Sequence, residues 1–343
     1  MVRRRADAGG LGWGPGLGPA ASADAGRAGT SKTQTLGTVV TTTTGKVRGE
    51  ADGTLRSFRG VPYATPPVGA LRWAPPRPAA AWTGVRGATT PGAPCAQPAG
   101  LPVGMPSESE DCLCLNVTAP AESDGRRPVI VWIHGGSPMY GTGDMYGPDR
   151  LAAGGAVVVS MNYRLGAMGF LSTPALEGAD GLGLEDQQAA LRWVRANAAS
   201  FGGDAGNVTV MGQSGGGYSV CGHLASPLSA GLLDRAVVQS APCATGGSRT
   251  RAEAEARRIV TAVKCEKNTA ACLREVPAAD LLKAYGPFNE PRPVSGTKLM
   301  PLSPREALHT GRFNRVPVLI GVNHDEERGM VLGQELAPGG APP

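Results

Sequence analysis

A serine that could act as a nucleophile occupies position 214, within the stretch VTVMGQSGGGY at residues 208–218. The surrounding pattern Gly-x-Ser-x-Gly can mark a hydroxyl that attacks an acyl carbon while a histidine accepts its proton. The pattern alone carries little weight here, because 51 of the 343 residues are glycine and chance can produce it. The neighbouring segments must therefore decide whether Ser214 is catalytic.

The segments on either side of Ser214 favour a catalytic role. The β-branched run NVTVMG at residues 207–212 predicts a strand, and GGYSVCGHLAS at residues 216–226 predicts a helix. A serine between a strand and a helix, with glycines on both sides, is typical of a nucleophile elbow, which is a sharp and strained turn. Such a turn lifts the hydroxyl above the sheet, at the positive end of the following helix.

The elements that must position this turn alternate along the chain. Apolar β-branched runs predict strands at residues 127–136, 156–164, 207–212, 233–241 and 316–323. Helical spacing predicts helices at residues 185–201, 216–226 and 251–263. This alternation predicts an α/β fold with a mostly parallel central sheet and helices on both faces. A hairpin is predicted at residues 38–49, with its turn near Gly45 and Lys46, and a Pro/Gly-rich loop at residues 60–108.

The chain is predicted to consist of a leader, residues 1–35, and one domain, residues 36–343. The leader is rich in Gly, Ala and Ser and shows no periodicity, which predicts disorder. Its start, MVRRR, and the run AASA at residues 20–23 resemble the ends of a secretory signal, but the stretch between them is too rich in Gly and Pro for an apolar signal core. Secretion and a cytoplasmic location with a disordered tail therefore both remain open.

Composition excludes several classes of function. The net charge is +5, and the only basic block is Arg3-Arg4-Arg5, so nucleic-acid binding is not expected. No run of 18 apolar residues occurs, so we expect no membrane span. The four histidines are scattered and show no metal-ligand spacing, so we expect no metal site.

Seven cysteines suggest disulfide chemistry. Cys95 and Cys112 flank a Pro/Gly-rich loop, and Cys265 and Cys272 flank a short polar stretch. Pairs of this kind can close loops in an oxidising compartment. The odd count leaves at least one thiol free or intermolecular, and the cysteines left over are Cys114, Cys221 and Cys243.

Several longer motifs occur in one order along the chain. They are FRGVPYATPPVGALRW (58–73), SEDCLCLNV (109–117), VWIHGGS (131–137), NYRLGAMGFLS (162–172), the Ser214 segment and IGVNHDEERG (320–329). On these motifs the chain resembles the type-B carboxylesterase family of the α/β-hydrolase superfamily, from about residue 36 to about residue 330. The resemblance implies an α/β-hydrolase fold and hydrolysis of a small carboxylic ester through an acyl-enzyme, without a cofactor.

The resemblance also assigns roles to individual residues. It implies that Ser214 is the nucleophile and that the backbone N–H groups of Gly135, Gly136 and Gly215 form the oxyanion hole. It places the acid of the triad at Glu326 in the loop after the last predicted strand. Asp325, which is adjacent, could be confused with this acid.

Further consequences concern cysteines and departures from the family pattern. The resemblance implies two disulfides, Cys95 with Cys112 and Cys265 with Cys272. Three departures lie around the nucleophile. Gln213 stands where the family often has Glu, Gly215 where it usually has Ala, and Gly217 extends the run of glycines.

The histidine of the triad has no obvious candidate. In α/β-hydrolases the chain order is Ser, then Asp or Glu, then His, whereas His134, His223, His309 and His324 all precede Glu326. His134 belongs to the oxyanion motif. His223 is expected to lie in the helix after Ser214 and to point away from the nucleophile, and His309 precedes the last predicted strand. His324 shares a loop with the acid and would act from the wrong strand end.

Two expectations follow from the missing histidine. The domain is expected to lack its C-terminal strands and helices, which would leave an apolar sheet edge exposed. The activity of the chain is then in question, and the alternatives are a non-catalytic binding protein or a non-functional fragment on a hydrolase scaffold. The retained serine and oxyanion glycines favour descent from a hydrolase. No oligomeric state is predicted.

Overall fold

The computed structural model describes residues 34–99, 105–123, 126–244, 246–267, 269–286, 291–326 and 328. Residues 1–33 of the predicted leader lie outside the described residues. The last two residues of that leader form a strand, β1 (Gln34–Thr35), which pairs with β8 (Glu122–Ser123).

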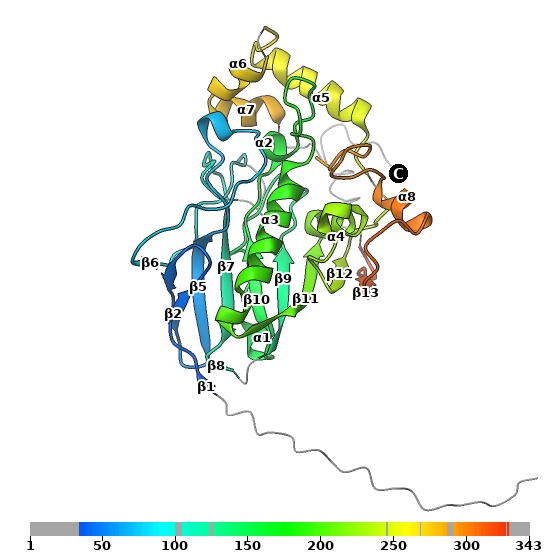
Figure 1. Cartoon of the computed structure of the whole chain (residues 1–343). Helices are drawn as coiled ribbons and strands as arrows, with labels where there is room; N and C mark the ends of the chain where they lie inside the picture. The colour runs from blue at the N-terminus through cyan, green and yellow to red at the C-terminus, as the bar shows by residue number, and fades with distance from the viewer. Residues whose placement is uncertain are drawn as a thin grey trace, which may run out of the picture. The chain divides into compact units, whose positions relative to one another are not determined.

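The central sheet has eight strands in the order β13-β12-β11-β9-β10-β7-β5-β4 (Figure 1). Their bounds are β4 Glu50–Ala51, β5 Leu55–Pro62, β7 Cys114–Pro120, β9 Arg127–Ile133, β10 Val157–Met161, β11 Gly203–Gln213, β12 Arg235–Gln239 and β13 Val318–Gly321. The strands from β9 to β13 are parallel to one another, whereas β7 pairs antiparallel with both β10 and β5. The predicted mostly parallel α/β sheet is confirmed, and all five predicted strands are present.

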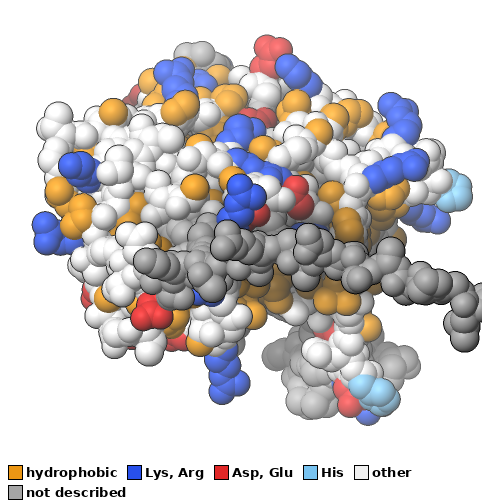
Figure 2. All heavy atoms as spheres, turned by 60° about the horizontal axis from the view of Figure 1, so that its bottom comes forward, with side chains coloured by type: hydrophobic (Ala, Val, Ile, Leu, Met, Phe, Trp, Pro, Cys, Tyr) orange, Lys and Arg blue, Asp and Glu red, His pale blue; other side chains and the backbone are white. Residues whose placement is uncertain are grey.

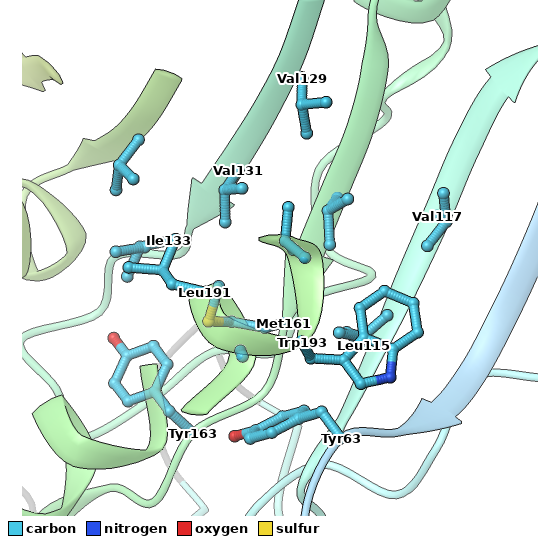
Figure 3. Close-up of a cluster of buried hydrophobic side chains, with 14 of the residues drawn as sticks. Tyr63, Leu115, Val117, Val129, Val131, Ile133, Met161, Tyr163, Leu191 and Trp193 are labelled. Atoms are coloured by element: carbon cyan, nitrogen blue, oxygen red, sulfur yellow. The ribbon is translucent and has the colours of Figure 1, made fainter. Parts of the chain in front are cut away.

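The central strands carry mostly apolar side chains, which are buried on one face of β9 and β11 and on both faces of β10. All residues of β10 are buried, as expected for a parallel strand covered on both sides. On one face, Val129, Val131 and Ile133 of β9 are completely buried and belong to the same hydrophobic cluster as Leu191 (Figure 3). Leu191 lies on α3 (Leu182–Asn197), so this helix contributes to the core on this face of the sheet.

Helices cover both faces of the sheet, as predicted. α3 and α4 (Gly215–Ala225) pack on the face that carries Val129 and Val131. The short helix α1 (Asp149–Ala153) packs on the opposite face, where Ala152 contacts a cluster with Val158 and Ile130.

Smaller elements surround this layer structure. The predicted hairpin is confirmed as β2 (Val39–Thr41) and β3 (Lys46–Arg48), which pair antiparallel and form a small sheet with β6 (Val85–Gly87). The helices outside the layers are α2 Gly166–Phe170, α5 Arg249–Ala262, α6 Thr269–Glu275, α7 Ala278–Tyr285 and α8 Pro304–His309. The helix predicted at residues 251–263 is α5.

Three disulfides connect loops to this frame. Cys95–Cys112 and Cys265–Cys272 are bonded as the resemblance implied, and a third bond joins Cys221 to Cys243. Cys114 is the free cysteine among the described residues. Burial raises the pKa of its thiol to about 12, so the thiol is protonated and unreactive at neutral pH.

The Cys221–Cys243 bond is expected to stabilise the domain. It closes a loop with a sequence separation of 22 and ties α4 to the segment after β12. Replacing both cysteines with alanine should lower the free energy of unfolding by about 2–4 kcal/mol, because the unfolded chain regains loop entropy. Urea unfolding of the double variant measures the difference. An unchanged midpoint and slope would show that the bond adds no stability.

Candidate active site

Ser214 lies in a strained turn between β11 and α4. Its backbone has φ 51° and ψ −120°, a conformation that non-glycine residues rarely adopt. The turn is held on both sides, because the Ser214 N–H donates to the Gln239 carbonyl at 2.9 Å and the Tyr218 N–H donates to the Ser214 carbonyl at 2.9 Å. The predicted strand–turn–helix context of the motif is therefore present.

The glycines of the motif are required by close backbone contacts. A Cβ atom on Gly216 would lie 2.0 Å from the Ile133 carbonyl oxygen, and one on Gly212 would lie 2.4 Å from the Gly216 carbonyl oxygen. No side chain fits at either position, so the motif reflects the packing of the turn against β9.

A second glycine-containing turn lies beside Ser214. Gly136 has φ 99° and Ser137 has φ 52°, and the Met139 and Tyr140 N–H groups both donate to the Gly136 carbonyl at 2.9 Å. This turn follows β9 directly, at the carboxyl edge of the sheet.

The two turns are in direct contact. A Cβ atom on Gly215 would lie 2.7 Å from Pro138 Cδ and 2.9 Å from the Ser137 nitrogen. A Cβ atom on Gly135 would lie 3.4 Å from the Cβ atom of Ser214. The structure thus brings together Ser214 and the segments that contain Gly135, Gly136 and Gly215.

Glu326 is linked to the elbow through the end of β12. Its Oε2 atom accepts hydrogen bonds from Ser240 Oγ at 2.9 Å and from the Asn323 N–H at 2.6 Å. Ser240 directly follows Gln239, the residue whose carbonyl holds Ser214. Asp325 instead faces solvent, with His324 and Arg328 each 3.0 Å from its Oδ1 atom. Glu326, and not Asp325, is therefore the carboxylate that hydrogen bonds connect to the turn of Ser214.

Ser240 was not identified from the sequence. It has φ 50°, and its backbone N–H donates to the Gly321 carbonyl at 2.8 Å, which ties β12 to β13 at this point. Its hydroxyl reaches a carboxylate 86 residues further along the chain. No local pattern signals either property, because both depend on the pairing of β12 with β13.

None of the four histidines lies at Ser214. His134 is buried, stacks on Tyr163 with ring centroids 4.4 Å apart, and has Nδ1 2.9 Å from the Gly135 carbonyl oxygen. His223 is buried between Ser229 and Gln187. His309 ends α8, and His324 has 92% of its side chain exposed. Within the described part of the chain, no hydrogen bond joins Ser214 Oγ to any imidazole.

The two buried histidines make the fold sensitive to acid. Burial lowers the pKa of His134 to about 4 and that of His223 to about 3, from an ordinary value of 6.5. Between pH 6.5 and about 4 the unfolded chain therefore binds more protons than the folded chain, and the free energy of unfolding falls as the pH falls. The loss is about 1.4 kcal/mol per pH unit for each histidine.

Replacing His223 with glutamine tests this pH dependence. Glutamine keeps hydrogen-bonding groups near Gln187 and Ser229 but does not titrate. Urea unfolding between pH 7 and pH 5 gives the free energy of unfolding at each pH. Plotted against pH, this free energy should have a smaller slope in the variant than in the parent chain, by the equivalent of about one bound proton. An identical slope in the two proteins would mean that His223 does not contribute to acid lability.

Two further features, a metal-ligating cluster and a membrane-spanning helix, are absent from the part of the chain that the structure describes. No group of three or more His, Cys, Asp or Glu residues there could hold a metal ion. No described helix is both long and apolar enough to cross a bilayer.

The model of the carboxylesterase family matches residues 37–337, which is most of the sequence. The chain belongs to the carboxylesterase family. The sequence resemblance and the fold that it implied are thereby confirmed.

Individual carboxylesterases show the same relationship. The chain is 40% identical over 311 residues to the para-nitrobenzyl esterase of Bacillus subtilis, which covers 84% of this chain and 63% of that protein. It is 39% identical over 313 residues to human carboxylesterase 3, which covers 84% of this chain and 55% of the relative. The chain thus spans less than two thirds of the length of these relatives.

Solved carboxylesterase structures share the fold. A PNB esterase superposes with a TM-score of 0.80 at 37% identity, covering 86% of this chain and 64% of the other. The carboxylesterase EST55 of Geobacillus stearothermophilus gives a TM-score of 0.80 at 39% identity, with 86% and 63% covered. These matches show that the α/β-hydrolase fold extends over most of this carboxylesterase chain.

Proposed function

We propose that this carboxylesterase chain carries a site for the hydrolysis of carboxylic esters, with Ser214 as the nucleophile. The observation that carries the proposal is the strained conformation of Ser214, at the N-terminus of α4 and against the turn of Gly135 and Gly136. Esterase names among the relatives support the same reaction class. A strained non-glycine residue at such a position is typical of functional sites.

The proposed reaction proceeds in two steps. Ser214 Oγ attacks the ester carbonyl carbon, and the new oxyanion accepts hydrogen bonds from the N–H groups of Gly135, Gly136 and Gly215. The C–O bond to the alcohol then breaks, and the alcohol leaves with a proton. Water attacks the resulting acyl-serine ester in the same way and releases the carboxylic acid. The reaction requires no cofactor or metal.

Glu326 is proposed to orient the base that accepts the Ser214 proton. A triad carboxylate holds an imidazole in the right tautomer and stabilises the imidazolium that forms. Ser240 and the Asn323 N–H fix the Glu326 carboxylate for this task. Among the described residues no imidazole is hydrogen-bonded to Ser214 Oγ, so none of the four histidines is assigned as this base.

Two alternatives describe the same site without catalysis. A binding protein on a hydrolase scaffold, or a non-functional fragment, would explain why no imidazole lies beside Ser214. The required glycines at positions 212 and 216 and the strained serine favour the hydrolase, because neither alternative needs a serine held in a strained conformation at an elbow.

We propose only a chemical class for the substrate and a broad location for the protein. A small carboxylic ester suits the proposed chemistry. Three disulfides favour an oxidising compartment, so we propose that the chain is secreted or otherwise extracytoplasmic.

Hydrolysis of p-nitrophenyl acetate tests the proposed function. The chain alone should hydrolyse the ester at close to the rate of its Ser214→Ala variant, because the base is absent. Added imidazole should raise the rate of the parent chain above that of the variant. Imidazole also cleaves activated esters by itself, so only the difference between the two proteins counts. Equal rates of the two proteins at every imidazole concentration would contradict a catalytic role for Ser214. Rapid turnover by the parent chain without imidazole would show that one of its own residues serves as the base.

A further inference from the structure

A disulfide joins the two segments that carry the residues of the candidate site. Cys221 lies on α4, seven residues after Ser214, which is about two helical turns. Cys243 lies three residues after Ser240, the residue whose hydroxyl donates to Glu326. The Cys221–Cys243 bond therefore connects the helix of the nucleophile to the segment that holds the candidate acid, beside the end of β12 (Figure 1).

The first turn of α4 also lies against this segment at close range. The Ser214 N–H donates to the Gln239 carbonyl at 2.9 Å. A Cβ atom on Gly217 would lie 2.7 Å from Ala241 Cβ and 3.0 Å from the Gln239 carbonyl oxygen, so only glycine allows this approach. The hydrogen bond at Ser214, the contact at Gly217 and the disulfide at Cys221 thus follow one another along α4.

Residues 239–243 hold both partners of the proposed site. Gln239 accepts the hydrogen bond from Ser214, and Ser240 Oγ donates to the Glu326 carboxylate at 2.9 Å. The Ser240 N–H also donates to the Gly321 carbonyl at 2.8 Å. β12 ends at Gln239, so the disulfide is a covalent restraint on a segment that lies beyond the strand.

The two serines of this unit have strained backbones. The φ angle is 51° for Ser214 and 50° for Ser240. Non-glycine residues keep such conformations only where the surrounding contacts over-determine them. The disulfide restrains both segments, so its loss should allow both turns to relax.

One sulfur of the bond is closer to solvent than the other. Cys221 is 1% exposed, whereas Cys243 is partly exposed. A small thiol therefore reaches the bond at Cys243. On the face shown in Figure 2, Lys and Arg side chains are mixed with Asp and Glu, so no patch of one sign there would steer a charged thiol.

We propose that the Cys221–Cys243 disulfide is a positioning element for the proposed reaction, and that low-molecular-weight thiols switch it off. The closed bond holds Ser214 relative to Glu326, and its reduction slows the acylation of Ser214. The loss of activity rests on the proposed esterase function, whereas the loosening of the two segments does not. Such a bond restricts activity to an oxidising compartment.

Reduction follows thiol–disulfide exchange. A low-molecular-weight thiolate attacks Cys243 Sγ, the S–S bond breaks, and Cys221 Sγ leaves as a thiolate that takes up a proton. A second thiolate attacks the outer sulfur of the mixed disulfide and releases Cys243, which is protonated to a thiol. Two external thiols are thereby oxidised to one disulfide, and the protein disulfide is reduced to two thiols.

Amide hydrogen exchange tests the positioning role without an activity assay. The full chain would be compared before and after reduction with dithiothreitol, an uncharged dithiol. Exchange of the Ser214 and Ser240 N–H groups should speed up by about tenfold or more relative to exchange in the buried strand β10. A general loss of stability would speed up exchange at all these amides by one factor. Equal factors would overturn the proposal.

Two double variants separate this bond from the other disulfides. Cys221→Ala/Cys243→Ala should exchange like the reduced parent chain, and dithiothreitol should not change its exchange at Ser214. Cys265→Ala/Cys272→Ala is the matched control, because it removes a partly exposed disulfide that joins the segment after α5 to α6. It should keep the parent's response to dithiothreitol. Loss of that response in the control variant would assign the effect to the wrong disulfide and overturn the proposal.

Ester hydrolysis tests the consequence for the proposed reaction. The quantity measured is the difference between the parent chain and Ser214→Ala, in the same redox state, with p-nitrophenyl acetate and imidazole. Dithiothreitol is removed under argon before the assay because thiols cleave this ester. Reduction should lower the difference by about 10- to 10²-fold, since small displacements of reacting groups have effects of this size. Reoxidation should restore it.

The outcomes distinguish the positioning role from the proposed function. Faster exchange at Ser214 and Ser240 with an unchanged rate would overturn the effect of the bond on acylation. If the oxidised parent chain already hydrolyses the ester no faster than Ser214→Ala, the proposed esterase function fails instead. Exchange at the two serines then decides whether the bond positions them.

Discussion

Replacing Asp186 with alanine is expected to lower the free energy of unfolding by about 3–5 kcal/mol. Asp186 forms a fully buried ion pair with Arg164, with Nη2–Oδ1 and Nε–Oδ2 distances of 2.7 and 2.8 Å. It also accepts the Arg164 backbone N–H at 3.1 Å, so it fixes both the side chain and the backbone of that residue. Without the carboxylate, the guanidinium remains buried and uncompensated.

An exposed ion pair provides the control for this substitution. Arg59 and Glu50 lie 3.4 Å apart, with 45% and 51% of their side chains exposed. Glu50→Ala should change the free energy of unfolding by about 0–1 kcal/mol, because water already solvates both charges. Urea unfolding of the two variants at pH 7 measures both effects. If both variants lost the same free energy of unfolding, burial of the Arg164–Asp186 pair would make no difference to what the pair contributes to stability.

Replacing Gly215 with alanine is expected to abolish most of the acylation of Ser214. The new Cβ would lie 2.7 Å from Pro138 Cδ and 2.9 Å from the Ser137 nitrogen, so one of the two turns must move. Movement would separate the N–H groups proposed for the oxyanion hole, and loss of a single donor costs about 10²–10³-fold in rate.

Gly147→Ala is the matched control for Gly215→Ala. A Cβ on Gly147 meets nothing within 4 Å, so this variant should acylate like the parent chain. The assay is the Ser214-dependent release of p-nitrophenol in the presence of imidazole. The double variant Gly215→Ala/Pro138→Ala should recover part of the rate, because Cδ of Pro138 is removed. Normal acylation by Gly215→Ala alone would refute a tight contact between the two turns.

The parallel core of the fold could be predicted from the sequence because its signals are local. Each of the strands β9 to β13 is a short apolar run, and the helices α3, α4 and α5 show their own periodicity. The antiparallel strands β5 and β7 were not predicted. β5 contains Arg56, which is 1% exposed and donates to the carbonyls of Gly37 and Phe201. Those partners come from distant segments, so no local pattern shows that an arginine can be buried there.

The candidate site was predictable to a similar extent. The elbow at Ser214 follows from the strand, glycine and helix signals around it, whereas Glu326 depended on the family resemblance. Ser240 and the Cys221–Cys243 bond were not predicted, since the first depends on the pairing of β12 with β13 and the second on how α4 meets the segment after β12. The sequence also shows directly that all four histidines precede Glu326.

The nucleophilic role of Ser214 can be tested most directly by trapping the acyl-enzyme. The chain would be incubated with p-nitrophenyl butyrate and imidazole, quenched with acid, digested and analysed by mass spectrometry. We expect a butyryl group on Ser214 in the parent chain and no butyrylated peptide from this region in Ser214→Ala. A butyryl group on a different residue, or an unmodified Ser214 peptide at all imidazole concentrations, would contradict the proposed esterase site.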